Sequence, residues 1–113
     1  MKTQLRPGEQ VVKQSLGNMK RGLQNIGGKL YLTTQRVIFE PHVFNIHSTI
    51  IAIELGQISS ATATWTTLLG VPLVPNAVQV ESPTGQACRF AVFNRQQWAG
   101  AIEWQRNALG GQT

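Results

Sequence analysis

The sequence contains no Asp, one Cys and few charged residues, and these shortages narrow the possible chemistry. Charged residues make up 13% of the 113 positions, with five Glu against ten Lys and Arg and a formal net charge of +5. This imbalance favours anionic partners, although it does not distinguish phospholipid from nucleic acid or acidic protein. Because hydrophobic residues reach 42%, we expect a folded core rather than a disordered chain.

The single cysteine and the short apolar runs limit where the chain can reside. Cys88 alone cannot form an internal disulfide, which fits a reducing compartment, and its strand-like surroundings predict a buried thiol rather than a nucleophile. The N-terminus lacks the apolar core of a signal peptide, and the runs 50–55 and 68–74 are far shorter than the roughly 20 residues that span a bilayer. We therefore expect a cytoplasmic protein whose contact with membranes is peripheral.

Two strand-like runs meet between residues 27 and 39, across a polar break at Thr34 and Gln35 that leaves room only for a hairpin turn. Alternation places Leu30 and Leu32 on one face of the first run, and Val37 and Phe39 on one face of the second. The remaining strands are expected to assemble around this hairpin.

The residues before the hairpin predict a half-exposed strand over 9–19, with Val12 and Leu16 on its apolar face. From Gly17 to Gly28 the composition is rich in Gly, Asn and cations, which predicts a loop or flexible strand ends.

After the hairpin, strand-like runs cover 51–55, 59–65, 78–80 and 88–92. Between them, Pro72 and Pro75 interrupt an apolar segment, which predicts a packed connection rather than a central strand. The pattern then becomes helical: Asn94 is expected to cap a helix that carries Trp98 and Ile102 on its apolar stripe and ends at 110–111.

The count is about seven strands followed by one C-terminal α-helix. This order predicts a mainly β fold, an antiparallel sandwich or partly open barrel, with the helix over one open end. We expect a single domain over 1–113 with its core at about 9–107.

The run from Gly28 to Phe39 resembles the signature of GRAM domains, a branch of the pleckstrin-homology-like superfold. The later runs 53–58 and 90–93, with Arg95 and Trp98, are similar in order, so the resemblance covers about 9–107. It implies a noncatalytic module, without a cofactor, that binds phosphoinositide or other anionic lipid or recognises protein partners, often at membranes.

The densest positive charge precedes the signature and defines the candidate lipid site. The main contacts are Lys20 and Arg21, with Lys13 and Lys29 in support; the alternative is that this loop tip is merely solvated. Phe44 and Ile46 are candidates for contact with a membrane or partner, or else pack against the sheet.

Other chemistries find little support in the residues. His42 and His47 are too few ligands for a metal site, and the five Glu are scattered over separate elements, so neither a metal centre nor an enzyme is expected. Nucleic acid is not favoured, because the cations do not cluster on a helix and no pair of stacking aromatics is evident on a strand. The sequence predicts weak, peripheral recognition of anionic membrane lipid, with a protein-interaction or self-assembling module as the alternative.

Overall fold

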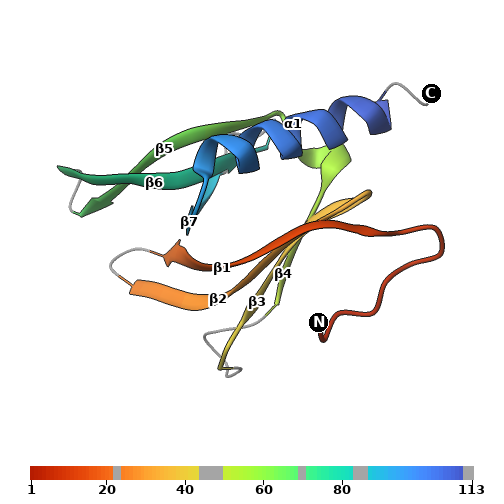
Figure 1. The fold of residues 1–113 in the computed structure, drawn as a ribbon, viewed down its shortest axis with the longest axis horizontal. Coiled ribbons are helices and arrows are strands. Elements are labelled where there is room, and N and C mark those ends of the chain that lie inside the picture. The colour runs from red at the N-terminus through yellow and green to blue at the C-terminus, as the bar shows by residue number, and fades with distance from the viewer. Residues whose placement is uncertain (22–23, 44–49, 69–70, 83–86, 111–113) are drawn as a thin grey trace.

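The computed structural model describes the backbone of residues 1–21, 24–43, 50–68, 71–82 and 87–110, and their side chains apart from 20, 21, 24, 25, 65–68, 71–76 and 110 (Figure 1). The elements in chain order are β1 (Val11–Arg21), β2 (Gln24–Thr33), β3 (Arg36–Pro41), β4 (Ile51–Glu54), the 3-10 turn η1 (Leu55–Gln57), β5 (Ser60–Leu68), β6 (Val71–Glu81), β7 (Ala87–Val92) and α1 (Arg95–Gly110).

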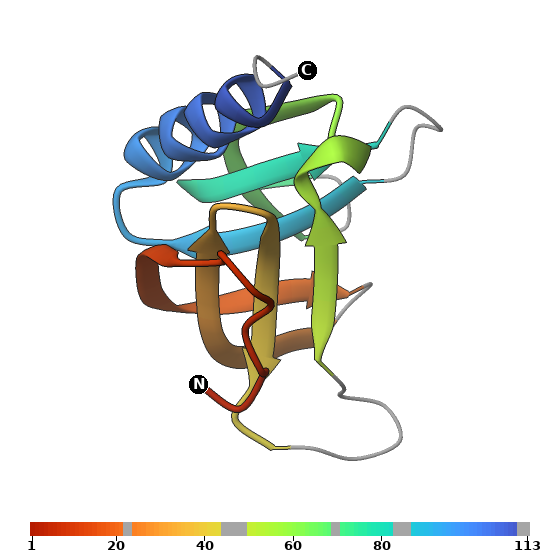
Figure 2. The same ribbon diagram turned by 90° about the vertical axis from the view of Figure 1, so that its right-hand side faces the viewer.

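The seven strands form one antiparallel sheet in the order β4-β3-β2-β1-β7-β6-β5. Its two halves are joined where β1 pairs with β7, from Gly17 opposite Val92 to Lys20 opposite Arg89. Figures 1 and 2 show the sheet folding at this seam into two layers, with α1 lying along β5 and β6. The predicted mainly β architecture is confirmed: the sheet forms a sandwich that stays open rather than closing into a barrel, followed by one C-terminal helix.

The hairpin between β2 and β3 is formed as predicted, with Leu32 opposite Val37 and Leu30 opposite Phe39. All four side chains are buried in the core cluster. The ring of Phe39 lies 5.7 Å from that of Phe90 on β7, so the hairpin contacts the other half of the sheet directly.

Gly17, Gly27 and Gly28 belong to strands, and the alternative of a loop over the whole stretch 17–28 was wrong. Gly17 on β1 faces Gly28 on β2. A Cβ atom at Gly17 would lie 2.8 Å from the carbonyl oxygen of Ala91, and a Cβ at Gly28 would collide with the carbonyl oxygen of Glu40. These positions therefore require glycine because neighbouring backbones approach closely, a use of glycine in strands that composition does not separate from a turn.

The connection predicted around Pro72 and Pro75 is also part of a strand. β6 runs through both prolines and pairs with β5, with register shifts near Thr66. The pairing of β6 with β7 is described only from Ala77 to Glu81. Since proline lacks the N–H donor, it is tolerated where a strand has a hydrogen-bonding neighbour on one side.

The apolar face of β1 differs from the prediction. Ser15 pairs with Leu30 and Lys13 with Leu32, so these polar residues share the face of the core. Leu16 is 60% exposed and Val12 is exposed as well. Met19 is buried opposite Phe90, so the odd-numbered residues of β1 from Lys13 to Met19 face the core. The apolar residues Val12 and Leu16 have even numbers and lie on the other face.

The C-terminal helix begins where predicted but its cap differs. Asn94 has a left-handed backbone with φ 57°, whereas an N-cap is usually extended, and its carbonyl oxygen accepts the Trp98 N–H at 3.0 Å. Trp98 and Ile102 are buried, while Trp104 is 67% exposed. Within the part of the chain that the structure describes, no helix combines the length and apolar character of a membrane span.

Candidate binding surface

The N-terminal segment, residues 1–10, lies across the outer face of β2 and β3 (Figure 2). Beneath it are side chains that the strand alternation points away from the core: Tyr31, Thr33, Arg36, Ile38 and Glu40, all of which are buried. This segment thus gives the hairpin a second buried face.

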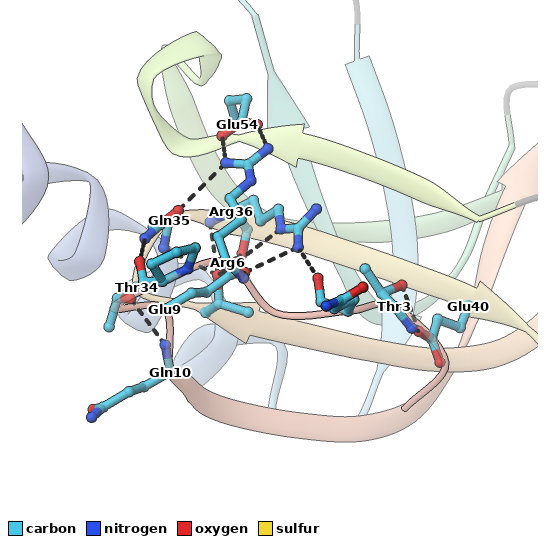
Figure 3. Close-up of polar contacts among 12 residues, drawn as sticks. Thr3, Arg6, Glu9, Gln10, Thr34, Gln35, Arg36, Glu40 and Glu54 are labelled. Carbon is cyan, nitrogen blue, oxygen red and sulfur yellow. Dashed lines mark hydrogen bonds and ion pairs between the residues drawn. The ribbon is translucent and has the colours of Figure 1, made fainter.

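A buried ion pair fixes the segment to the hairpin. Arg36 Nε lies 2.8 Å from Glu9 Oε2, and Arg36 Nη2 donates to Glu9 Oε1 at 3.0 Å and to the Gln4 carbonyl oxygen at 2.9 Å (Figure 3). The Thr33 hydroxyl donates to the same carboxylate at 2.7 Å. The bonds from Arg36, followed by that from Thr33, outweigh burial and lower the pKa of Glu9 to about 2.

Two more carboxylates attach the segment, one at Lys2 and Thr3 and the other at Arg6. Glu40 accepts the backbone N–H groups of Lys2 and Thr3 at 3.0 and 2.7 Å and the Thr3 hydroxyl at 2.6 Å. Burial acts to raise the pKa of Glu40, but these bonds together lower it. Glu54 on β4 pairs with Arg6, and this hydrogen bond lowers the pKa of Glu54 (Figure 3).

These shifts predict a loss of stability in acid. The pKa of Glu9 is lower in the folded chain, about 2, than its ordinary value of 4.5, so its contribution is complete above about pH 4.5 and disappears as the pH falls towards 2. We expect the free energy of unfolding in urea to fall by about 2 to 3 kcal/mol over this range from Glu9 alone. The variant Glu9→Gln should show a flatter pH dependence there; an equally steep one would contradict the assignment.

All five glutamate side chains accept hydrogen bonds from other groups of the chain. Besides Glu9, Glu40 and Glu54, Glu81 accepts from Gln79 at 2.6 Å and Glu103 pairs with Arg106 at 2.7 Å. The carboxylates of Glu9, Glu54 and Glu103 are each paired with an arginine. Negative charge is thus held in internal contacts, so the surplus of positive charge determines what an approaching partner meets.

The four predicted lipid-contacting cations lie in different places. Lys13 shares the core-side face of β1, and its ammonium nitrogen is 5.4 Å from the centre of the Trp98 ring. Lys29 is exposed on the opposite face, paired with Leu16. Lys20 and Arg21 end β1, paired with Asn25 and Gln24.

At about 3.3 Å per strand residue, Lys13 is about 23 Å from Lys20 along β1. The structure therefore does not bring the four predicted cations together around one headgroup.

The other predicted contacts can be placed only in part. Phe44, Ile46 and His47 lie outside the described residues. His42 is exposed at the end of the hairpin, and Cys88 is half-buried against the core. Among the described residues, no three His, Cys or Glu side chains are grouped as metal ligands would be.

A surface hollow of about 350 Å³ lies at the seam between β1, β2 and β7. Its lining is mostly apolar and consists of Leu16, Gly17, Asn18, Gly27, Gly28, His42, Ala91, Val92 and Phe93. Phe93 is 82% exposed. The sequence indicates this exposure, because Phe90 and Val92 face the core and the alternation of a strand then places Phe93 on the opposite face.

Comparison with known proteins agrees with this architecture. The linker-DH/PH structure of p115-RhoGEF has a TM-score of 0.71 at 11% identity, covering 91% of this chain and 31% of that one. The Vps36 N-terminal PH domain has a TM-score of 0.67 at 17% identity, covering 94% and 85%. The C-terminal domain of an unknown protein from Leishmania infantum has a TM-score of 0.71 at 17% identity, covering 88% and 86%. At these identities the likeness shows the fold alone.

Sequence comparison identifies the family. No curated protein sequence is significantly similar to the chain. The model of the GRAM domain matches residues 1–103, which include the N-terminal segment as well as the sheet and most of α1. The chain therefore belongs to the GRAM domain family, whose pleckstrin-homology-like fold is typical of modules that bind lipid or protein.

Proposed function

We propose that this chain is a noncatalytic binding module that associates weakly with the surface of anionic membranes, as a peripheral protein of a reducing, cytoplasmic compartment. Lys20 and Arg21 at the end of the β1–β2 hairpin make the main contacts, and Lys29 supports them from the outer face of β2. Lys13 adds to the positive potential from the other side of the sheet.

The distribution of charge is the observation that carries this proposal. Every carboxylate accepts a hydrogen bond within the molecule, and three of them are neutralised by arginine. The hairpin formed by β1 and β2 carries four cations and no acidic residue between Val11 and Thr33. A surface of this kind attracts the phosphates of lipid headgroups.

The expected strength is low. At about 1 kcal/mol per cation near an anionic surface, Lys20, Arg21 and Lys29 provide about 3 kcal/mol. This corresponds to an association weaker than about millimolar, so a second contribution is needed for stable binding.

The proposal is tested by sedimentation with vesicles of phosphatidylcholine, with and without phosphatidylserine. The variant Lys20→Gln with Arg21→Gln should bind the anionic vesicles about thirtyfold more weakly, since each cation contributes about fivefold. A matched control, Gln96→Glu with Asn107→Glu, changes the net charge equally at two exposed sites on α1 and should change binding less than about threefold. Equal losses in both variants, or no preference for anionic vesicles in the parent protein, would refute the proposal.

The alternative function, a protein-interaction or self-assembling module, is favoured by one observation. The described sheet ends at β4, which pairs with β3 from Ile51 to Glu54. A terminal strand can accept an added strand from a partner or a second copy. Light scattering at high protein concentration tests self-assembly: a constant monomer mass would exclude it.

A further inference from the structure

We infer that Leu16 and Phe93 are the apolar part of the membrane contact, entering the interfacial layer of an anionic bilayer while Lys29 meets the headgroups. This inference rests on the proposed function. It supplies the second contribution to membrane affinity that stable binding needs in addition to the cations. It assigns a role to the seam between β1 and β7.

Leu16 and Phe93 come from distant parts of the chain and line the same hollow. Leu16 is 60% exposed in the middle of β1, and Phe93 is 82% exposed just after β7. Gly27 and Gly28 also line this hollow, and having no side chains they leave both apolar groups uncovered. The pairing of Gly17 with Val92 sets the two strands side by side, so one flat surface can meet both residues.

The charges around the two side chains complement an anionic bilayer. Leu16 pairs with Lys29, so both project from the same face of the sheet, and Lys29 is exposed. The nearest carboxylate along this row is Glu40, opposite Lys29, and it is buried and occupied by the backbone N–H groups of Lys2 and Thr3. Exposed apolar groups flanked by cations bind at membrane interfaces through both components.

The N-terminal segment extends this surface. A second, smaller hollow of about 190 Å³ adjoins the first at His42 and is lined also by Met1, Lys2 and Lys29. The face thus carries apolar side chains at the first hollow and two lysines at its neighbour, beside the occupied carboxylate of Glu40. A bilayer accommodates such a broad mixed surface without requiring a shape-matched partner.

The test compares the double variant Leu16→Ser with Phe93→Ser against Trp104→Ser, a control that removes from α1 an aromatic whose 67% exposure lies between those of Leu16 and Phe93. With phosphatidylserine-containing vesicles, the double variant should bind at least about tenfold more weakly, because two apolar side chains no longer leave water. Trp104→Ser should bind as the parent does. The single variant Phe93→Trp should bind at least as well, since Trp favours the membrane interface.

Salt separates this inference from the function on which it rests. Near 1 M salt, where the Debye length is about 3 Å, the residual binding should depend on Leu16 and Phe93 and no longer on Lys20 and Arg21. If the parent binds anionic vesicles and the double variant binds equally well, the inference is wrong and the proposed function stands. If the parent binds no vesicles, both fail.

A change of oligomeric mass in the double variant, with vesicle binding intact, would assign this face to self-association and overturn the inference. Leu16, Phe93 and Trp104 are all exposed, so the thermal unfolding of each variant should match that of the parent. A change in vesicle binding would then report on the contact rather than on stability.

Discussion

The variant Arg36→Ala is expected to lower the free energy of unfolding by about 3 to 5 kcal/mol, because it leaves the buried Glu9 carboxylate without its counter-charge. Arg36 makes two contacts to Glu9 and a third to the Gln4 carbonyl, and all of these join the N-terminal segment to the hairpin. The loss of free energy should therefore include the contacts of the N-terminal segment as well as the cost of the unpaired charge. Urea unfolding followed by circular dichroism measures it.

The ion pair between Arg106 and Glu103 on α1 provides the control. It has a similar distance of 2.7 Å, but its Arg106 side chain is 30% exposed and the pair lies within one helix. The variant Arg106→Ala should cost about 1 kcal/mol or less. Similar losses for Arg36→Ala and Arg106→Ala would contradict the view that the Glu9–Arg36 pair holds the N-terminal segment in place.

The variant Trp98→Ala is expected to destabilise the fold by about 3 to 5 kcal/mol, because it removes the largest fully buried side chain among those that the structure describes. Trp98 begins the apolar stripe of α1, and the Lys13 ammonium lies over its ring. Its removal would leave a cavity between the helix and the sheet. Urea unfolding with circular dichroism again gives the loss.

Trp104→Ala is the matched control, with the same change on the exposed side of the same helix. It should cost less than about 1 kcal/mol, in keeping with its exposure. If Trp104→Ala proved as destabilising as Trp98→Ala, the described orientation of α1 would be wrong.

Local alternation was sufficient to predict the hairpin and much of the sheet. Leu30 shares a face with Leu32, and Val37 with Phe39, because a strand has a period of two. The pairing of β2 with β3 then puts both pairs on the same side. The same rule places Arg36 on the opposite face of the hairpin, but it does not predict which residues cover that face. The partner, Glu9, lies 27 positions away and joins Arg36 through tertiary folding.

The binding surface was harder to predict from the sequence, because it too depends on contacts made through tertiary folding. Lys13, Lys20 and Lys29 are near one another in sequence, but strand pairing puts Lys13 on the face opposite Lys29 and seven residues along β1 from Lys20. Leu16 was predicted on the apolar face of its strand, and it is exposed because Met19 sets the parity of β1. The composition around Gly17 and Gly28 indicated a loop or flexible strand ends, whereas these two glycines permit the close approach of strands.

The most direct test of the proposed function is the binding of the parent protein to phosphatidylcholine vesicles over increasing fractions of phosphatidylserine, at low and high salt. We predict much weaker binding to neutral than to anionic vesicles, binding that rises with phosphatidylserine, and a decrease towards the residual binding through Leu16 and Phe93 as the Debye length falls from about 10 Å at 0.1 M to about 3 Å at 1 M salt. Equal binding to neutral and anionic vesicles, or none to either, would contradict the assignment of this GRAM domain as a module for anionic membranes.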